Sequence, residues 1–416
     1  RHPPFVIRQS SFVIPIRYPN MASDSQSQRE KNSPETTADQ LYEPLAPKRS
    51  RRQEFWMLFK KNRLAIMGLV LFVLFFFTAL IGLILTSGTN PVFDPALIRL
   101  QERLHSPLAK PNLETLQPNE IPALGIYLLG TDDLGRDVFA RMLQGAWVSL
   151  TVGFVAVGIS VVIGIFLGGI AGYFGQRHIR VDHLLGILFL MIGMLLLATH
   201  FAYAGATIIL ITAGFVIYRI RKKAPLKKQK TTWKRMLQKD TLSVDTLIMR
   251  FVDVMLCFPS FFLILTVVAL LPASIYNIMI VIGLTSWMGA TRFVRAEFLS
   301  LREQDFVAAA KALGLSNLRI IFRHMMPNAI APVLVSATIG IATAILTEAG
   351  LSFLGFGVPP PHATWGNILS DGRRFIFDAP WLTFVPGFAI LMVVLSFNLF
   401  GEGLRDVMNP KLRERQ

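Results

Sequence analysis

The sequence predicts an all-α membrane protein with several transmembrane helices, and three observations support this fold class. Hydrophobic residues make up 52% of the 416 positions and charged residues 16%, below the roughly one quarter usual in a soluble domain. Several apolar runs of 18 or more residues carry no charge, the length a helix needs to cross about 30 Å of hydrocarbon. The Lys and Arg residues gather between these runs, which explains the net charge of +16 without a nucleic-acid partner.

The amino-terminal residues 1–53 are predicted to form a disordered cytoplasmic tail, because residues 21–53 are polar and contain proline. Residues 1–20 precede Met21 and are set aside as sequence that need not be native. An amino-terminal helix and the first span follow at 54–86, and an external loop with an interfacial helix at 87–145. The eight predicted spans are Leu64–Thr86, Ala146–Tyr173, Leu184–Thr199, Phe201–Tyr218, Phe251–Leu271, Ala273–Thr291, Ala329–Gly350 and Trp381–Gly401.

Orientation follows from the distribution of basic residues. With both termini cytoplasmic, 35 of the 42 Lys and Arg lie on the cytoplasmic side, including the basic block at 219–239 and the tail at 402–416. Residues 184–218 are too long for one crossing, so they form either a hairpin turning near His200 or one tilted span with an interfacial helix. The hairpin is favoured because it keeps the basic block cytoplasmic. That block binds anionic lipid or only anchors the topology.

The stretch "DFVAAAKALGLSNLRIIFRHMMPN" at 305–328 lies between two predicted spans on the cytoplasmic side. Its pattern predicts two short helices joined at Gly314, which suits a left-handed helix end, with Ser316 capping the second helix and Pro327 stopping it. Such an element either anchors the loop in lipid headgroups or docks a cytoplasmic partner. Its two predicted apolar faces are Phe306, Ala309, Ala310 and Leu313, then Leu318, Ile321, Phe322 and Met325.

"AAAKALG", followed at a fixed spacing by "HMMP", resembles the cytoplasmic EAA-loop signature of ABC importer permeases. Ala308, Ala309 and Ala310 match its first three positions, and Gly314 and Pro327 match its glycine and proline. Ala308 stands where the family has glutamate, so the contact of that side chain with an ATPase is not expected here. The residues that this resemblance implies for ATPase coupling are Asp305, Phe306, Ala309, Ala310, Leu313, Gly314, Ser316, Arg319 and Pro327.

Four further blocks resemble the C-type permeases of peptide and nickel importers, in the family's order. They are "EFWMLFKKNRLAIMGLVLFVL", "LGTDDLGRDVFARMLQGAWVSLTVG", "VDTLIMRFVDVMLCFPS" and "EAGLSFLGFGVPPPHATWGNIL". In the family a short link joins "AGYFG" to "VDTLIMR", whereas here residues 178–243 intervene. The resemblance implies a type I importer permease with a six-helix family core, made of the first span at 54–86 and the permease core at 146–177 and 244–401. A two-helix hairpin and a basic loop are inserted at 178–243.

The same resemblance implies a translocation subunit in a bacterial cytoplasmic membrane, with no cofactor of its own. Its implied partners are a homologous permease, two cytoplasmic ATP-binding subunits and an external solute-binding protein. The sequence holds no G-x-x-x-x-G-K-[ST] loop, Cys/His metal cluster or catalytic triad, so ATP hydrolysis is expected in separate subunits and the chain is not expected to be an enzyme. Dipeptides, oligopeptides, nickel chelates and oligosaccharides all remain open as substrates.

Few charged residues fall inside the predicted spans, where charge is costly. Asp253 lies three residues after Arg250 and is expected to pair with it. Glu348 either lines the substrate path or makes a buried contact with a neighbouring helix. Only these two acids could serve a proton relay, which weakens the alternative of an ion- or proton-coupled secondary carrier. The lone Cys257 excludes an intramolecular disulfide.

Overall fold

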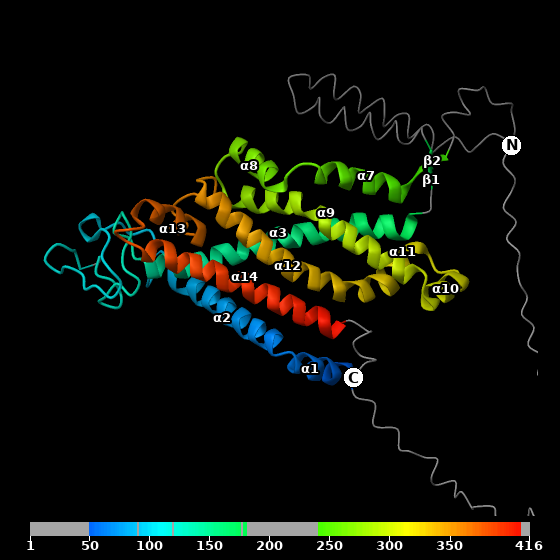
Figure 1. Cartoon of the computed structure of the whole chain (residues 1–416), viewed down its shortest axis with the longest axis horizontal. Coiled ribbons are helices and arrows are strands. Elements are labelled where there is room, and N and C mark those ends of the chain that lie inside the picture. The colour runs from blue at the N-terminus through cyan, green and yellow to red at the C-terminus, as the bar shows by residue number, and fades with distance from the viewer. Residues whose placement is uncertain (1–49, 90, 119, 176–177, 181–239, 409–416) are drawn as a thin grey trace, which may run out of the picture. The chain divides into compact units, whose positions relative to one another are not determined.

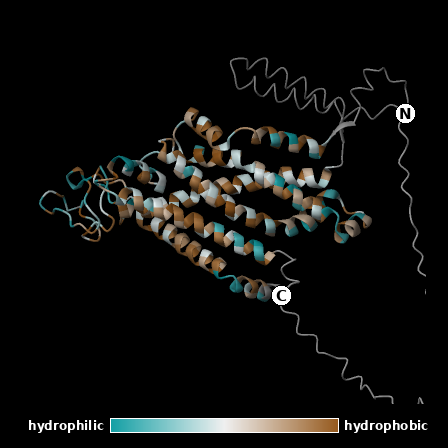
Figure 2. Ribbon diagram, in the orientation of Figure 1, coloured by the Kyte–Doolittle hydropathy of each residue, from teal (hydrophilic) through white to brown (hydrophobic). Residues whose placement is uncertain are grey.

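The computed structural model describes residues 50–408 except 90, 119, 176–177 and 181–239. The described residues from Phe55 onward form one compact unit (Figure 1). In the described residues five continuous helices are long and apolar enough to span a membrane, and one bent pair makes a sixth candidate. Most residues of these helices are hydrophobic, while hydrophilic residues gather in the loop region before α3 (Figure 2). The predicted all-α, multi-pass architecture is confirmed; the side on which each terminus lies stays a prediction.

The described helices fall into a membrane-length group and a shorter group. The membrane-length ones are α2 (Arg63–Thr86), α3 (Val138–Phe174), α9 (Ile275–Arg302), the continuous helix from Asn317 to Phe353, and α14 (Trp381–Met408). The remaining helices are α1 (Arg51–Lys61), η2 (Leu100–Glu102), α7 (Val244–Leu256), α8 (Ser260–Leu270), α10 (Asp305–Ala312), α13 (Trp365–Gly372) and η4 (Arg373–Phe375).

Helix α3 lies at the centre of the bundle and packs closely along α9. Three of its glycines recur every fourth residue, at Gly164, Gly168 and Gly172, on the face that meets α9. A Cβ atom on Gly168 would lie 2.6 Å from the carbonyl oxygen of Thr291, so only glycine permits this approach. Stripes of small residues allow the close backbone contact by which membrane helices associate. The glycines in α3 therefore position α9 and the segment that follows it.

Several predicted span boundaries differ from the ends of the helices in the structure. The span predicted from Ala146 belongs to a helix that begins at Val138, because Asp137 caps it by accepting a hydrogen bond from the backbone N–H of Phe139 (2.9 Å). An interfacial helix was predicted within 87–145, but around Arg136, Asp137 and Arg141 this region is a capping turn followed by the first turn of α3. The loop region between α2 and α3 is otherwise largely irregular in its described part.

The span predicted over Phe251–Leu271 is broken into α7 and α8, which are bent by 77°. Pro259 stands immediately before α8, and its ring removes a backbone donor and disfavours helical geometry in the preceding residue. The next span extends beyond the predicted Thr291 to Arg302. Its polar end is tolerated because Arg295 forms an ion pair with Asp245 of α7.

The insertion predicted at 178–243 is described only at its two ends. Strand β1 (His178–Arg180) pairs antiparallel with β2 (Asp240–Ser243), with His178 opposite Ser243. Gly175 lies so close to Asp245 that a Cβ on the glycine would be 3.1 Å from the Cβ of the aspartate. The chain therefore leaves and rejoins the bundle at one place. The predicted hairpin at 184–218 and the basic block at 219–239 lie outside the described residues.

Deleting residues 178–243 and joining their flanks with a short Gly-Ser link is expected to leave a membrane-inserted protein. The physical reason is the contact between Gly175 and Asp245, which a few residues can bridge. A reporter fused to the carboxyl terminus should report the same side of the membrane as in the full chain. Deletion of 184–199 alone, which would remove one predicted crossing, is the control and should disturb that location. A reporter that changes side after the full deletion would contradict the hairpin.

Candidate coupling site and the polar clamp

The first half of the segment 305–325, here called the coupling element, is a short helix ended by a glycine. Helix α10 stops at Ala312, and Gly314 has φ of +73°, the left-handed conformation predicted for it. The backbone N–H groups of Gly314 and Leu315 donate to the carbonyls of Lys311 and Ala310, at 3.0 and 3.2 Å. These bonds satisfy the free carbonyls at the helix end.

The predicted apolar face of α10 is only partly correct. Val307 and Ala310 are the buried residues, Phe306 is half-buried, and Leu313 is 79% exposed. Ala309, which was predicted on the same face, is also exposed. An eight-residue helix contacts the bundle along a narrow stripe, so a small rotation decides which side chains are covered. The exposed position of Leu313 leaves an apolar side chain next to the glycine turn.

The second half of the coupling element is not a separate helix. Helix α11 (Asn317–Arg319) continues through a π-helical segment, η3 (Ile320–Met325), into α12 (Met326–Phe353). Pro327 was predicted to stop the helix, but it is the second residue of α12 and the helix continues through it. The proline is tolerated because its missing N–H falls next to the wider π turn. Ser316 precedes α11 but makes no side-chain capping bond, which corrects its predicted role.

The coupling element is attached to both α3 and α9. The hydroxyl of Tyr173 in α3 donates to Oδ1 of Asn317 at 2.7 Å, and the ammonium of Lys311 lies 5.8 Å from the Tyr173 ring centre. Ile320 and Met325 are fully buried in a cluster that includes Phe298 of α9. Tyr173 was not predicted as a site residue. The element therefore has fixed neighbours at its base.

Three large apolar side chains of the coupling element face away from the bundle. Leu313 is 79%, Leu318 66% and Phe322 63% exposed. Leu318 and Phe322 were predicted on the buried face with Ile321 and Met325, whereas the structure buries only the latter two. Asp305 and Arg319 are exposed on the same short segment. The result is an exposed apolar surface with charged neighbours, which suits either of the two predicted roles, anchoring in lipid headgroups or docking of a cytoplasmic partner.

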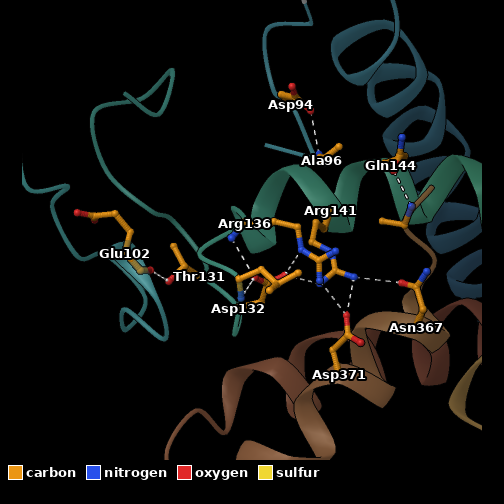
Figure 3. Close-up of polar contacts among 12 residues, drawn as sticks. Asp94, Ala96, Glu102, Thr131, Asp132, Arg136, Arg141, Gln144, Asn367 and Asp371 are labelled. Carbon is orange, nitrogen blue, oxygen red and sulfur yellow. Dashed lines mark hydrogen bonds and ion pairs between the residues drawn. The ribbon is translucent and has the colours of Figure 1, made fainter. Parts of the chain in front are cut away.

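A network of charged side chains, here called the polar clamp, lies at the other end of the bundle (Figure 3). Asp132 is completely buried and pairs with Arg136 (2.7 Å) and Arg141 (2.5 Å). Asp371 of α13 pairs with the same two arginines, at 3.1 and 2.9 Å, and Nη2 of Arg141 donates to Asn367 at 3.3 Å. The clamp thus joins the loop before α3, the first turn of α3, and α13.

Backbone contacts reinforce the attachment of α13 to α3. The indole N–H of Trp365 donates to the carbonyl of Met142 (3.2 Å), and the N–H of Ala363 donates to the side chain of Gln144 (2.6 Å). Thr364 begins α13 with a capping box.

In the loop region before α3, burial raises the pKa of Tyr127 to about 12, so this phenol remains neutral beside the guanidinium of Arg99.

Glu348 lies near the carboxyl end of α12 and has no exposed surface. One carboxylate oxygen accepts from the hydroxyl of Ser352 (2.7 Å) and the other from Ser149 of α3 (3.3 Å). No Lys, Arg or His forms an ion pair with it in the part of the chain that the structure describes. These contacts correspond to the buried-contact alternative; a role in the substrate path stays a prediction.

Asp253 has the predicted partner and a closer one. Its carboxylate lies 3.9 Å from Arg250 and 2.5 Å from Arg292 of α9. All three side chains are exposed, at 44%, 79% and 51%. Exposed pairs contribute little to stability.

Among the described residues no group of His, Cys, Asp and Glu could hold a metal ion.

Two family models match the chain. Residues 242–414 match the binding-protein-dependent transport system inner membrane component, and residues 50–104 match the N-terminal transmembrane domain of oligopeptide transport permease C. A dipeptide transport system permease protein of Alkalihalophilus pseudofirmus is 35% identical over 384 residues, 92% of this chain and 96% of the relative. The chain belongs to this permease family. The permease is thus the translocation subunit of an importer and spans the membrane several times.

Other relatives support the same assignment. A dipeptide transport system permease protein of Haemophilus influenzae is 34% identical, with 89% of this permease and 98% of the relative aligned. An oligopeptide transport system permease protein of Bacillus subtilis is 30% identical, with 86% and 88% aligned. These relatives are transport permeases and not enzymes, and the family works with ATPase and binding-protein partners. The family assignment favours the importer over an ion- or proton-coupled carrier.

Proposed function

We propose that this permease forms half of a peptide pathway through a bacterial cytoplasmic membrane. It pairs with a homologous permease, receives energy from two cytoplasmic ATP-binding subunits, and takes its substrate from an external solute-binding protein. The names of the relatives, which specify dipeptides and oligopeptides, favour peptides over nickel chelates and oligosaccharides. The coupling element is the contact with one ATP-binding subunit.

One observation carries the coupling proposal. Leu318 and Phe322 expose an apolar surface on a segment that is helically continuous with α12, and the exposed Leu313 lies just before the Gly314 turn. An exposed apolar surface of this kind marks an interaction site. Because the surface and the span share one helix, force applied to the surface acts directly on the span. The same surface merely embedded in lipid would need no such continuity.

Replacing Leu318 and Phe322 together with serine is expected to weaken binding of the ATP-binding subunits at least about tenfold, because apolar anchors dominate such contacts. The measurement is co-purification of the permease with its native partner subunits, followed by the vesicle uptake of labelled dialanine and hexaalanine. Leu124→Ser, at an exposed apolar position in the loop region before α3, is the matched control. Full co-purification of the double variant would refute the docking role. Uptake by this permease without ATP-binding subunits would refute the importer mechanism.

A further inference from the structure

We propose that Glu348 is a positioning residue through which α12 controls residues 354–372, here called the gate segment. This inference rests on the proposed function, because it assigns the gate segment to the end of the translocation path opposite the coupling element. The helix from Asn317 to Phe353 has 37 residues, about 55 Å at 1.5 Å per residue. The coupling element lies at one end of this helix and the gate segment follows directly from the other.

The gate segment is held on one side by α3. Four of its residues make this attachment, through side-chain or backbone hydrogen bonds and ion pairs. They are Ala363 with Gln144, Trp365 with Met142, Asn367 with Arg141, and Asp371 with Arg136 and Arg141. These contacts join the gate segment to α3 and to Arg136 just before it. The same segment is also joined to α12, because the hydroxyl of Ser370 donates to the carbonyl of Phe353 at 3.0 Å.

Glu348 lies where the gate segment, α3 and α12 meet. Its carboxylate accepts from Ser149 of α3 and from Ser352 of α12, and the hydroxyl of Thr364 lies 3.4 Å from that of Ser352. All four side chains are at least 97% buried. The group thus connects α12 through hydrogen bonds both to α3 and to Thr364, the residue that caps α13.

The packing around this group leaves no room for gradual movement. A Cβ atom on Gly366 would lie 2.7 Å from Cα of Ala349 and from Cβ of Ser352. Tightly packed contacts of this kind change between discrete arrangements and do not deform continuously. A buried carboxylate without a neighbouring cation needs its hydroxyl donors to offset the cost of its desolvation. If α12 is displaced relative to α3, the carboxylate must therefore exchange the hydrogen bond from Ser149 for another. Glu348 therefore gives α12 a defined position at the gate segment.

A contact with substrate is the competing role, and the geometry disfavours it. Glu348 has no exposed surface, and both of its carboxylate oxygens already accept hydrogen bonds from the protein. A residue that reads a passing solute needs an accessible polar atom. The structure thus supports a connection between helices.

The test uses the complete transporter, reconstituted with its native partners in liposomes. The variants are Glu348→Ala, which removes the acceptor, and Glu348→Gln, which keeps the side-chain length and one carbonyl acceptor. Thr343→Ala is the matched control, because its exposed hydroxyl bonds only within α12. Spin labels at His362→Cys in the gate segment and Leu113→Cys before α3, in a Cys257→Ser background, report the distance between the two regions.

In the wild-type transporter we expect the distance distribution to differ between the nucleotide-free and the ATP–vanadate-trapped states. In Glu348→Ala this difference should disappear, and dialanine imported per ATP hydrolysed should fall about tenfold while ATP hydrolysis continues. Glu348→Gln should stay within about threefold of wild type, because its amide can still bond both serines. If Glu348→Ala does not fold, Ser149→Ala takes its place and should show the same loss of response in a weaker form.

A nucleotide response and a coupling ratio in Glu348→Ala equal to wild type would overturn the proposal. A Glu348→Gln variant as defective as Glu348→Ala would also overturn it, because Glu348 would then have only a structural role. A third contrary result would be a wild-type distance distribution that is the same in the nucleotide-free and ATP–vanadate-trapped states. Wild-type vesicles without ATP-dependent peptide uptake would instead refute the proposed function. The two failures are therefore distinguishable.

Discussion

Replacing Gly314 with valine is expected to reduce ATP-driven peptide uptake at least about tenfold while leaving membrane insertion intact. Gly314 has φ of +73°, a conformation that costs an L-residue roughly 1–2 kcal/mol and a β-branched one more. No atom lies within 4 Å of the position that a Cβ would take, so the strain acts on the turn and not on packing. A changed turn moves α10 and Leu313 relative to Leu318 and Phe322, which disrupts the proposed docking surface.

Co-purification of the ATP-binding subunits and uptake by reconstituted vesicles measure this effect. Gly314→Asn is the matched control, because asparagine tolerates the left-handed conformation far better than valine does. It should retain most of the activity. Undiminished transport by the valine variant with native partners would show that the shape of this turn is not required for coupling.

Replacing Arg141 with leucine is expected to produce the largest loss of stability among the changes considered. Arg141 is 3% exposed and pairs with the completely buried Asp132 as well as with Asp371. Removing one partner of a buried ion pair costs about 3–5 kcal/mol, and the remaining bond from Arg136 places the expected loss at about 3 kcal/mol. The apparent melting temperature of the purified protein should fall by several degrees.

Thermal unfolding in detergent, followed by size-exclusion chromatography, measures this change. Arg103→Leu, at an exposed position in the loop region before α3, removes the same charge without a buried partner and should have little effect. Adding Asp132→Asn to Arg141→Leu should recover part of the loss, since the second change removes the stranded charge. Equal melting temperatures for the Arg141 and Arg103 variants would contradict the clamp.

The sequence predicted the membrane spans better than their ends. Charge-free length identifies a span, but Asp137 extends α3 by capping it, and this depends on a side chain that also suits a loop. Pro259 was a visible signal for the break between α7 and α8. It was overlooked because the apolar run on both sides of it has the length of a single crossing.

Prediction of the site was limited by contacts between distant parts of the chain. The left-handed backbone conformation of Gly314 was predicted correctly, because this conformation is a local property of the residue. Which residues of the coupling element are buried depends on Tyr173 and Phe298, which lie on two other helices. The clamp joins Arg141 to Asp371, 230 positions away, so nothing local in the sequence could reveal it.

The π-helical segment at 320–325 sets the direction in which the docking surface points. Its backbone N–H groups bond five residues back, as Met326 does to Ile321, so it holds one residue more than an α-helix over the same turn. Each residue of an α-helix advances the chain by 100° about its axis. Loss of a single residue here would convert the turn to α-helix and swing Leu318 and α10 around the axis of α12 by about 100°. The direction of the proposed docking surface therefore depends on one inserted residue, and a homologue without it would have to present a different side of its first turn.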